Sequence, residues 1–457
     1  MQLPRGGAVM PGVARSVPSP PAVAPPAGGN PPAGAPIAMP AGAGLAAGKA
    51  PPFRLPGEHF TAALCFLALG TAGIVVAAPE LASGAYLSPR VTAITHLFTL
   101  GWITTSMMGA LYQFLPVATG QPIRSARMAH ATFTLYVPGV LAFVTGLVTG
   151  RMPVMLGGAA AMGTAVLAFV ANLGATLHES RRRDATWWAL ACAACFLAVT
   201  VLLGLALAGN LNWGYLGGGR LLALGTHLHV ALAGWVLMVM IGVAHRLLPM
   251  FLLSHGAGER FAKAAVALVA CGAGVLAVLH HSPPLISSWL PALLITAGCI
   301  AFLMQAREFY VHRHRRELDP GMGLAAVALA MIAVGVVLAW IVLLADVRPR
   351  IAVAYVATLL MGISLFVVAH YYKIIPFLVW YHRWGPLAGK RQLPRVNELY
   401  SATLARSAGM LLILGALGIL PSIVLGAPAA LRVGALVFAA GVMLVIIQMI
   451  QLARNSP

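Results

Sequence analysis

Twelve apolar stretches, separated by short polar connections, run from residue 59 to residue 453. As α-helices rising 1.5 Å per residue, each is long enough to cross about 30 Å of membrane hydrocarbon. The pattern therefore predicts an all-α integral membrane protein with twelve transmembrane helices. The expected spans are 59–79, 91–117, 128–150, 153–177, 186–209, 219–245, 262–282, 286–306, 322–345, 351–380, 402–426 and 429–453.

Residues 1–57 lack this pattern and consist mostly of proline, alanine and glycine. Such a segment buries too little apolar area to offset the entropy of ordering, so we predict a disordered tail followed by one transmembrane domain over 58–457. The composition agrees, because 60% of the residues are hydrophobic and only 9% are charged. The sequence GRMPV at 150–154 predicts a tight turn between the third and fourth spans.

The basic residues predict the orientation. All but six of the 29 lysines and arginines lie in the N-terminal tail, after even-numbered spans or at the C-terminus. By the positive-inside rule, both termini and these connections face the cytoplasm, which predicts a multi-pass protein of the bacterial inner membrane. The net charge of +19 then suits anionic membrane lipid and requires no nucleic acid. The ten acidic residues fall in connections or at span ends, which argues against a proton pump or ion-coupled transporter.

The second and sixth spans repeat one motif. THLFTLGWITTSMMGALYQFLP and LHVALAGWVLMVMIGVAHRLLP share a histidine 20 residues before their last proline, then Gly-Trp and a further glycine. His96 precedes Pro116, and His229 precedes Pro249, by this distance. The tenth span ends similarly, at Pro376, but has valine at the histidine position. The spacing predicts three pseudo-repeated units of four helices.

Five histidines are expected near the outer edge of the bilayer. His96 and His229 stand about 30 Å of helix from prolines at the cytoplasmic edge, and His227 points about 200° away from His229 on the same helix. His280 and His281 end the seventh span at the same level. Neutral imidazoles bind haem iron or copper, so these five are candidate metal ligands. The alternatives are helix-to-helix hydrogen bonds and, for the last two, a hydrated helix end.

The run GTHLHVALAGWVLMVMIGVAHRLLP resembles the histidine helix of haem-copper oxidase subunit I, especially C-type oxidases and nitric oxide reductases. The resemblance extends to the twelve-helix, three-unit plan over 59–454. It implies that His96 and His229 share a low-spin haem, that His227 binds a second haem, and that His280 and His281 help bind copper. In the oxidases the His-x-His pair stands in the tenth helix, whereas here His227 and His229 stand in the sixth span. The chain is therefore more similar to solitary relatives such as the NnrS proteins of nitric oxide response.

These observations favour a membrane protein that binds haem b, with copper as a candidate second metal. Its role would be electron transfer, the reduction of O2 or NO, or a response to one of these gases. The electron donor would be a cytochrome c or a similar protein, and an enzymatic activity would be that of an oxidoreductase. Two alternatives stay open. One is a cofactor-free permease for a neutral solute, and the other is a haem or copper handling factor for oxidase assembly.

Overall fold

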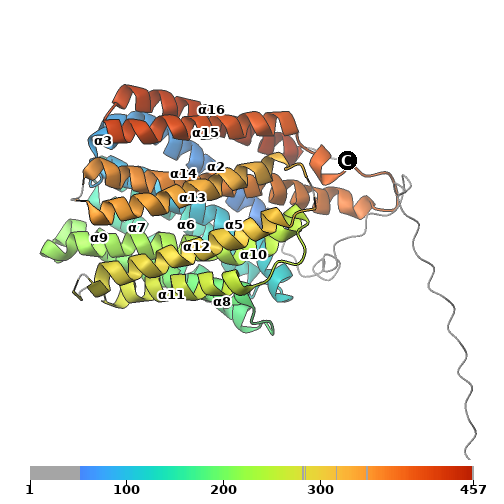
Figure 1. Ribbon diagram of the computed structural model, residues 1–457, viewed down its shortest axis with the longest axis horizontal. Coiled ribbons are helices and arrows are strands. Elements are labelled where there is room, and N and C mark those ends of the chain that lie inside the picture. The colour runs from blue at the N-terminus through green and yellow to red at the C-terminus, as the bar shows by residue number, and fades with distance from the viewer. Residues whose placement is uncertain (1–51, 280–281, 284, 315, 346–347, 455–457) are drawn as a thin grey trace, which may run out of the picture. The chain divides into compact units, whose positions relative to one another are not determined.

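The computed structural model describes residues 52–279, 282–283, 285–314, 316–345 and 348–454, and in these ranges every regular element is a helix. Within these ranges, eleven helices are long and apolar enough to cross a membrane. The second expected span is also continuously helical, from Pro89 to Thr119. The protein is therefore an all-α, multi-pass membrane protein, and its long helices run side by side (Figure 1).

The elements follow the expected spans closely. They are α2 (Arg54–Val76), α3 (Ala78–Ser83), α4 (Pro89–His96), η1 (Leu97–Thr104), α5 (Thr105–Thr119), α6 (Ala126–Thr149), α7 (Met152–His178), α8 (Ala185–Trp213), η2 (Gly217–Gly219), α9 (Arg220–His229), η3 (Val230–Leu237), α10 (Met238–Leu252), α11 (Arg260–Leu279), η4 (Leu285–Trp289), α12 (Leu290–Val311), α13 (Pro320–Leu344), α14 (Pro349–Val379), η5 (Trp380–Trp384), η6 (Gly385–Leu387), η7 (Val396–Glu398), α15 (Ala402–Leu425) and α16 (Pro428–Arg454).

Helix α2 begins at Arg54, inside the range that the sequence assigned to the tail. The helix thus starts a few residues before the expected boundary at residue 57, although Pro56 and Gly57 follow its first residue closely. Proline is tolerated in the first turn of a helix, where its missing N–H has no partner to lose. Residues 1–51 of the expected tail lie outside the described residues.

The helix ends follow ordinary capping chemistry. At the start of α6, the Ser125 hydroxyl accepts a hydrogen bond from the Met128 backbone N–H at 3.1 Å. The same helix ends at Gly150, whose φ of 68° is the left-handed conformation that glycine adopts without strain. Helix α7 then begins at Met152, with Pro153 in its first turn. The tight turn expected over 150–154 is confirmed.

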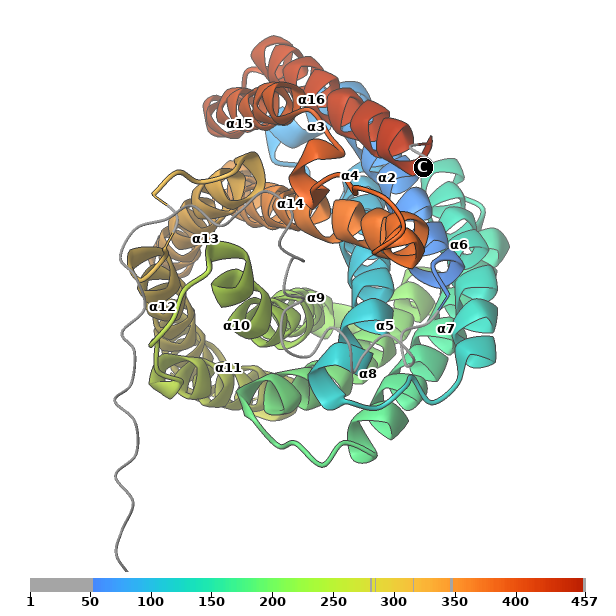
Figure 2. The ribbon, with the colours of Figure 1, turned by 90° about the vertical axis from the view of Figure 1, so that its right-hand side faces the viewer.

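Helices α5, α10 and α14 lie towards the middle of the arrangement, and the other long helices surround them (Figure 2). The most apolar stretches of Gly217–Leu252 and Pro349–Leu387 are 72% buried, whereas that of α13 is 22% buried. Helices α5 and α10 are the later parts of the second and sixth expected spans, and α14 covers the tenth. Side chains placed on them are therefore shielded from lipid.

Three helix hairpins pack extensively, namely α6 with α7, α11 with α12, and α15 with α16, and α13 packs against α14 to a similar extent. In the first, a Cβ on Gly146 would lie 2.3 Å from the Met155 backbone nitrogen, so the two backbones touch where the side chain is absent. Small residues favour such close approach in membranes. The hairpins occupy corresponding places in the three expected units, α2–α7, α8–α12 and α13–α16. The threefold repeat itself stays a prediction.

Candidate functional site

The two histidine helices share a backbone irregularity. Helix α4 ends at His96 and continues as the π-helix η1, and α9 ends at His229 and continues as the π-helix η3. Both π segments are 8 residues long and contain the Gly-Trp dipeptide. Such π segments are rare and are frequent at functional sites. The internal repeat of the second and sixth spans aligns these two histidines, and in the structure each is the last α-helical residue before a π-helix.

The imidazoles of His96 and His227 face each other. Their ring centroids are 6.5 Å apart and their planes differ by 24°. The edge of Phe143 lies against His96, with centroids 5.0 Å apart. Both imidazoles are half-buried. The structure therefore brings together two predicted ligands from different helices, α4 and α9.

Each of these imidazoles is oriented by a backbone carbonyl. His96 Nδ1 lies 2.8 Å from the Thr92 carbonyl oxygen, and His227 Nδ1 lies 3.1 Å from the Thr200 carbonyl oxygen of α8. A carbonyl oxygen can only accept, so each Nδ1 donates its hydrogen in the neutral ring. The lone pair then resides on Nε2, the nitrogen that can bind a metal.

Helix α8 shapes the place of His227. A Cβ on Gly204 would lie 3.0 Å from His227 Cε1, closer than ordinary contact. Gly204 stands one turn after Thr200, so the same strip of α8 supplies both the carbonyl oxygen and the space for the ring. The sequence did not identify this glycine, because nothing local links it to a histidine 23 positions later.

His229 points to a different neighbour. Its Nδ1 lies 2.8 Å from the Gly225 carbonyl oxygen, and its ring stacks on Tyr355 of α14 with centroids 6.0 Å apart and planes at 22°. The structure thus sets His227 beside His96, whereas the resemblance had paired His96 with His229. Counting angles along one helix shows that the two rings diverge, but it does not show which helix each ring meets.

The carbonyl bond alone does not mark a ligand. His59 and His370 each hold Nδ1 2.8 Å from the carbonyl oxygen four residues earlier, and both rings are buried without a facing imidazole. Within the described residues, no three side chains of His, Cys, Asp or Glu converge on a point where they could hold a metal ion. His280 and His281, the expected copper ligands, lie outside the described residues.

The Gly-Trp repeat has a packing role. A Cβ on Gly101 would lie 2.6 Å from the Phe66 ring, and one on Gly234 would lie 2.7 Å from Phe196. Each glycine therefore admits a phenylalanine from the preceding long helix. The Trp235 indole N–H donates to the Thr104 hydroxyl at 3.2 Å, which joins η3 to η1. The repeat places the two histidine helices against each other.

Three buried carboxamides escaped the sequence analysis. They stand on the last helix of each expected unit, and each is associated with the residue four positions before the proline of the inner helix. We call these contacts the amide junctions, and they are Asn172 with Tyr112, Gln305 with His245, and Gln448 with Tyr372. The available signal was the presence of polar amides in the fourth, eighth and twelfth apolar stretches, which hold one, one and two of them.

The acidic side chains of the described residues lie in connections or near helix ends, as the sequence indicated, and several pair with bases there. Asp184 caps α8 and pairs with Arg246, and Asp319 caps α13 and pairs with Lys373. Both bases stand three residues before the proline of an inner helix. These pairs anchor helix ends and leave the histidine pair without a carboxylate neighbour among its recorded contacts.

No protein-family model matches the chain, and no curated protein sequence is similar to it.

Proposed function

We propose that this chain is a haem-binding integral membrane protein in which His96 and His227 hold the haem iron. The single observation that carries the proposal is the facing pair of imidazoles. Both rings have Nδ1 turned to a carbonyl oxygen, which leaves both Nε2 atoms available as ligands.

The distance between the rings supports this assignment. An imidazole nitrogen binds a metal at about 2 Å, so two nitrogens on opposite sides of one ion stand ~4 Å apart and the ring centroids ~6 Å apart. The observed 6.5 Å is close to that value. A pair of helix-packing histidines would be expected to bond each other or a neighbour through Nε2, and within the described part of the chain neither ring makes such a bond.

The donor set decides the chemistry. Two neutral imidazoles bring no charge, and they suit haem iron, with copper as the other metal that imidazole favours. A haem held by these two imidazoles would supply one-electron transfer. His96 and His227 would hold the iron, and the Thr92 and Thr200 carbonyl oxygens would fix the ring orientations.

The finer roles remain part of the proposal. A cytochrome c or similar donor, a response to O2 or NO, and a second metal beside His229 are extensions that the resemblance suggests. His229 stacks on Tyr355 rather than on another imidazole. A metal there would need a ligand from outside this pair, and an open coordination position for a gas would fit that setting.

The test measures the reduced-minus-oxidised optical spectrum and the iron and copper content of purified protein. Variants His96→Ala, His227→Ala and His229→Ala are compared, with His370→Ala as a matched control for a buried, carbonyl-bonded histidine. We expect a b-type signal that is lost in the first two variants and kept in the last two. Loss in His96→Ala and His229→Ala, with His227→Ala intact, would restore the pairing implied by the resemblance. Folded protein without metal would refute haem binding.

A further inference from the structure

The three amide junctions differ in the side chain that stands opposite the amide. In the third unit, the Gln448 Nε2 donates directly to the Tyr372 hydroxyl at 3.1 Å. In the first unit, the Tyr112 hydroxyl lies near Asn172, which is one carbon shorter than glutamine, and no hydrogen bond joins the two side chains. The second unit has His245 where the other two have tyrosine. Imidazole is shorter than phenol and lacks the outer hydroxyl, so Gln305 meets a shorter partner.

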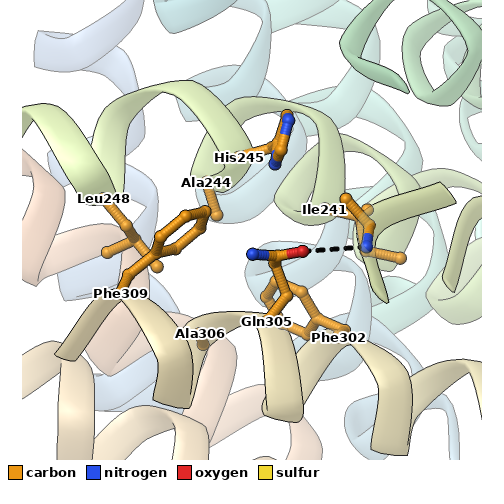
Figure 3. Close-up of a pocket in the computed structure, with 9 residues that line it drawn as sticks. Ile241, Ala244, His245, Leu248, Phe302, Gln305, Ala306 and Phe309 are labelled. Carbon is orange, nitrogen blue, oxygen red and sulfur yellow. Dashed lines mark hydrogen bonds between the residues drawn. The ribbon is translucent and has the colours of Figure 1, made fainter. Parts of the chain in front are cut away.

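A small cavity occupies the space that the missing hydroxyl leaves. It lies between α10 and α12, has a volume of about 10 Å³, and is lined by apolar side chains together with His245 and Gln305 (Figure 3). Two buried polar atoms on its wall have no protein partner, namely His245 Nδ1 and Gln305 Nε2. Buried polar atoms without partners are rare in native proteins, which indicates that something else satisfies this pair.

The orientation of the Gln305 amide is fixed. Its Oε1 accepts a hydrogen bond from the Ala262 backbone N–H at 3.0 Å, the dashed line in Figure 3. Because the oxygen is engaged at the start of α11, the amide must present its NH2 group at the cavity. Gln305 Nε2 is therefore a donor that needs an acceptor.

The tautomer of His245 follows from its other face. Its Nε2 lies 3.7 Å from a carboxylate oxygen of Glu259, which is half-exposed. A carboxylate only accepts, so in the neutral ring the hydrogen is favoured on Nε2. Nδ1 then carries the lone pair and faces the cavity as an acceptor. The cavity wall thus offers one donor and one acceptor.

We propose that this junction binds one water molecule, which replaces the tyrosine hydroxyl of the other two units. The water accepts from Gln305 Nε2 and donates to His245 Nδ1. The cavity volume is at the lower limit for one water, ~10–15 Å³, so a larger ligand is excluded. A metal ion is disfavoured because the NH2 group points a hydrogen at the site.

The first test is X-ray hydroxyl-radical footprinting of the full chain in detergent, since radicals form from bound water inside a fold. Phe302 and Phe309 line the cavity, and Phe438 is equally buried elsewhere. We expect both cavity residues to be oxidised at least several times faster than Phe438. Equal, slow oxidation of all three would overturn the proposal. This outcome does not depend on haem, so it is separable from the proposed function.

The second test exchanges the junction residue. His245→Tyr supplies the hydroxyl and displaces the water, whereas His245→Phe fills a similar volume without it. We expect His245→Tyr to keep the wild-type Tm within ~1 °C and to lose the rapid oxidation of Phe302 and Phe309. We expect His245→Phe to lower the Tm by ~2–4 °C. Equal Tm values for the two variants, or rapid oxidation retained in His245→Tyr, would contradict a bound water at this place.

Discussion

Gly204→Ala is the substitution that examines the histidine pair most directly, because it changes no ligand. The added Cβ would lie 3.0 Å from His227 Cε1, whereas ordinary contact begins at 3.4 Å. The ring must therefore retreat from α8 by about 0.4 Å or more. The Thr200 carbonyl oxygen is on the same strip of α8, so the retreat also lengthens a hydrogen bond that is already 3.1 Å.

The energies can be set against each other. Alanine in place of glycine favours the helix by about 1 kcal/mol, and overpacking costs about 1–3 kcal/mol. Weakening the bond from His227 Nδ1 to the Thr200 carbonyl oxygen costs a further ~0.5–1.5 kcal/mol. Folding stability should fall by only ~0.5–3.5 kcal/mol. Loss of the partner that orients a ligating histidine should weaken metal binding by about 10–100-fold.

The assay is an optical titration of apo-protein with haem, together with a thermal melt of each variant. Gly174→Ala on α7 is the matched control, since a Cβ there meets nothing within 4 Å. We expect the haem Kd to rise for Gly204→Ala and to stay unchanged for Gly174→Ala. An unchanged Kd in Gly204→Ala, in protein that binds haem normally, would refute the reasoning that α8 positions His227.

Two further predictions concern contacts that hold helices together. The hydrogen bond from Trp235 to Thr104 should show a coupling of about 0.5–1.5 kcal/mol in a double-mutant cycle with Trp235→Phe and Thr104→Val, measured by unfolding in detergent; strictly additive effects would contradict it. The Arg90 guanidinium donates a hydrogen bond to Glu80 and lowers the pKa of that carboxyl below its ordinary value of 4.5. The ion pair therefore stabilises the fold above pH 4.5, and this stabilisation is lost as the pH falls through the lowered pKa of the folded state. Glu80→Gln should therefore lower the free energy of unfolding by less than about 1 kcal/mol at pH 7, and this deficit should shrink as pH falls below 4.5; a deficit that does not change with pH would show another cause.

The hydrophobic pattern was sufficient to place the long helices, with ends shifted by a few residues. Helices α13 and α16 illustrate this, since the expected spans 322–345 and 429–453 became Pro320–Leu344 and Pro428–Arg454. Runs of apolar residues and their proline, glycine and aspartate boundaries are local features. The π-helices η1 and η3 were not predicted, because a regular 3.6-residue turn was assumed throughout both spans.

The candidate site was predicted in part. The sequence singled out His96, His227 and His229, because histidine is unusual in an apolar stretch and the Gly-Trp motif recurred around two of them. It could not tell that His227 rather than His229 meets His96, since that depends on which helices become neighbours. The roles of Gly204 and of Gln305 were equally hidden, because each acts on a side chain far away in sequence.

By itself, the sequence determined that this is a membrane protein of long apolar helices, and it determined which side chains bring unusual chemistry into them. Those properties depend on the free energy of transferring each segment from water to lipid, which is a sum over neighbouring residues. Only the tertiary structure decided which imidazole faces which, and where a tyrosine hydroxyl is missing from an otherwise repeated junction. These are contacts between segments tens to more than a hundred residues apart, and close packing sets them to within a fraction of an ångström.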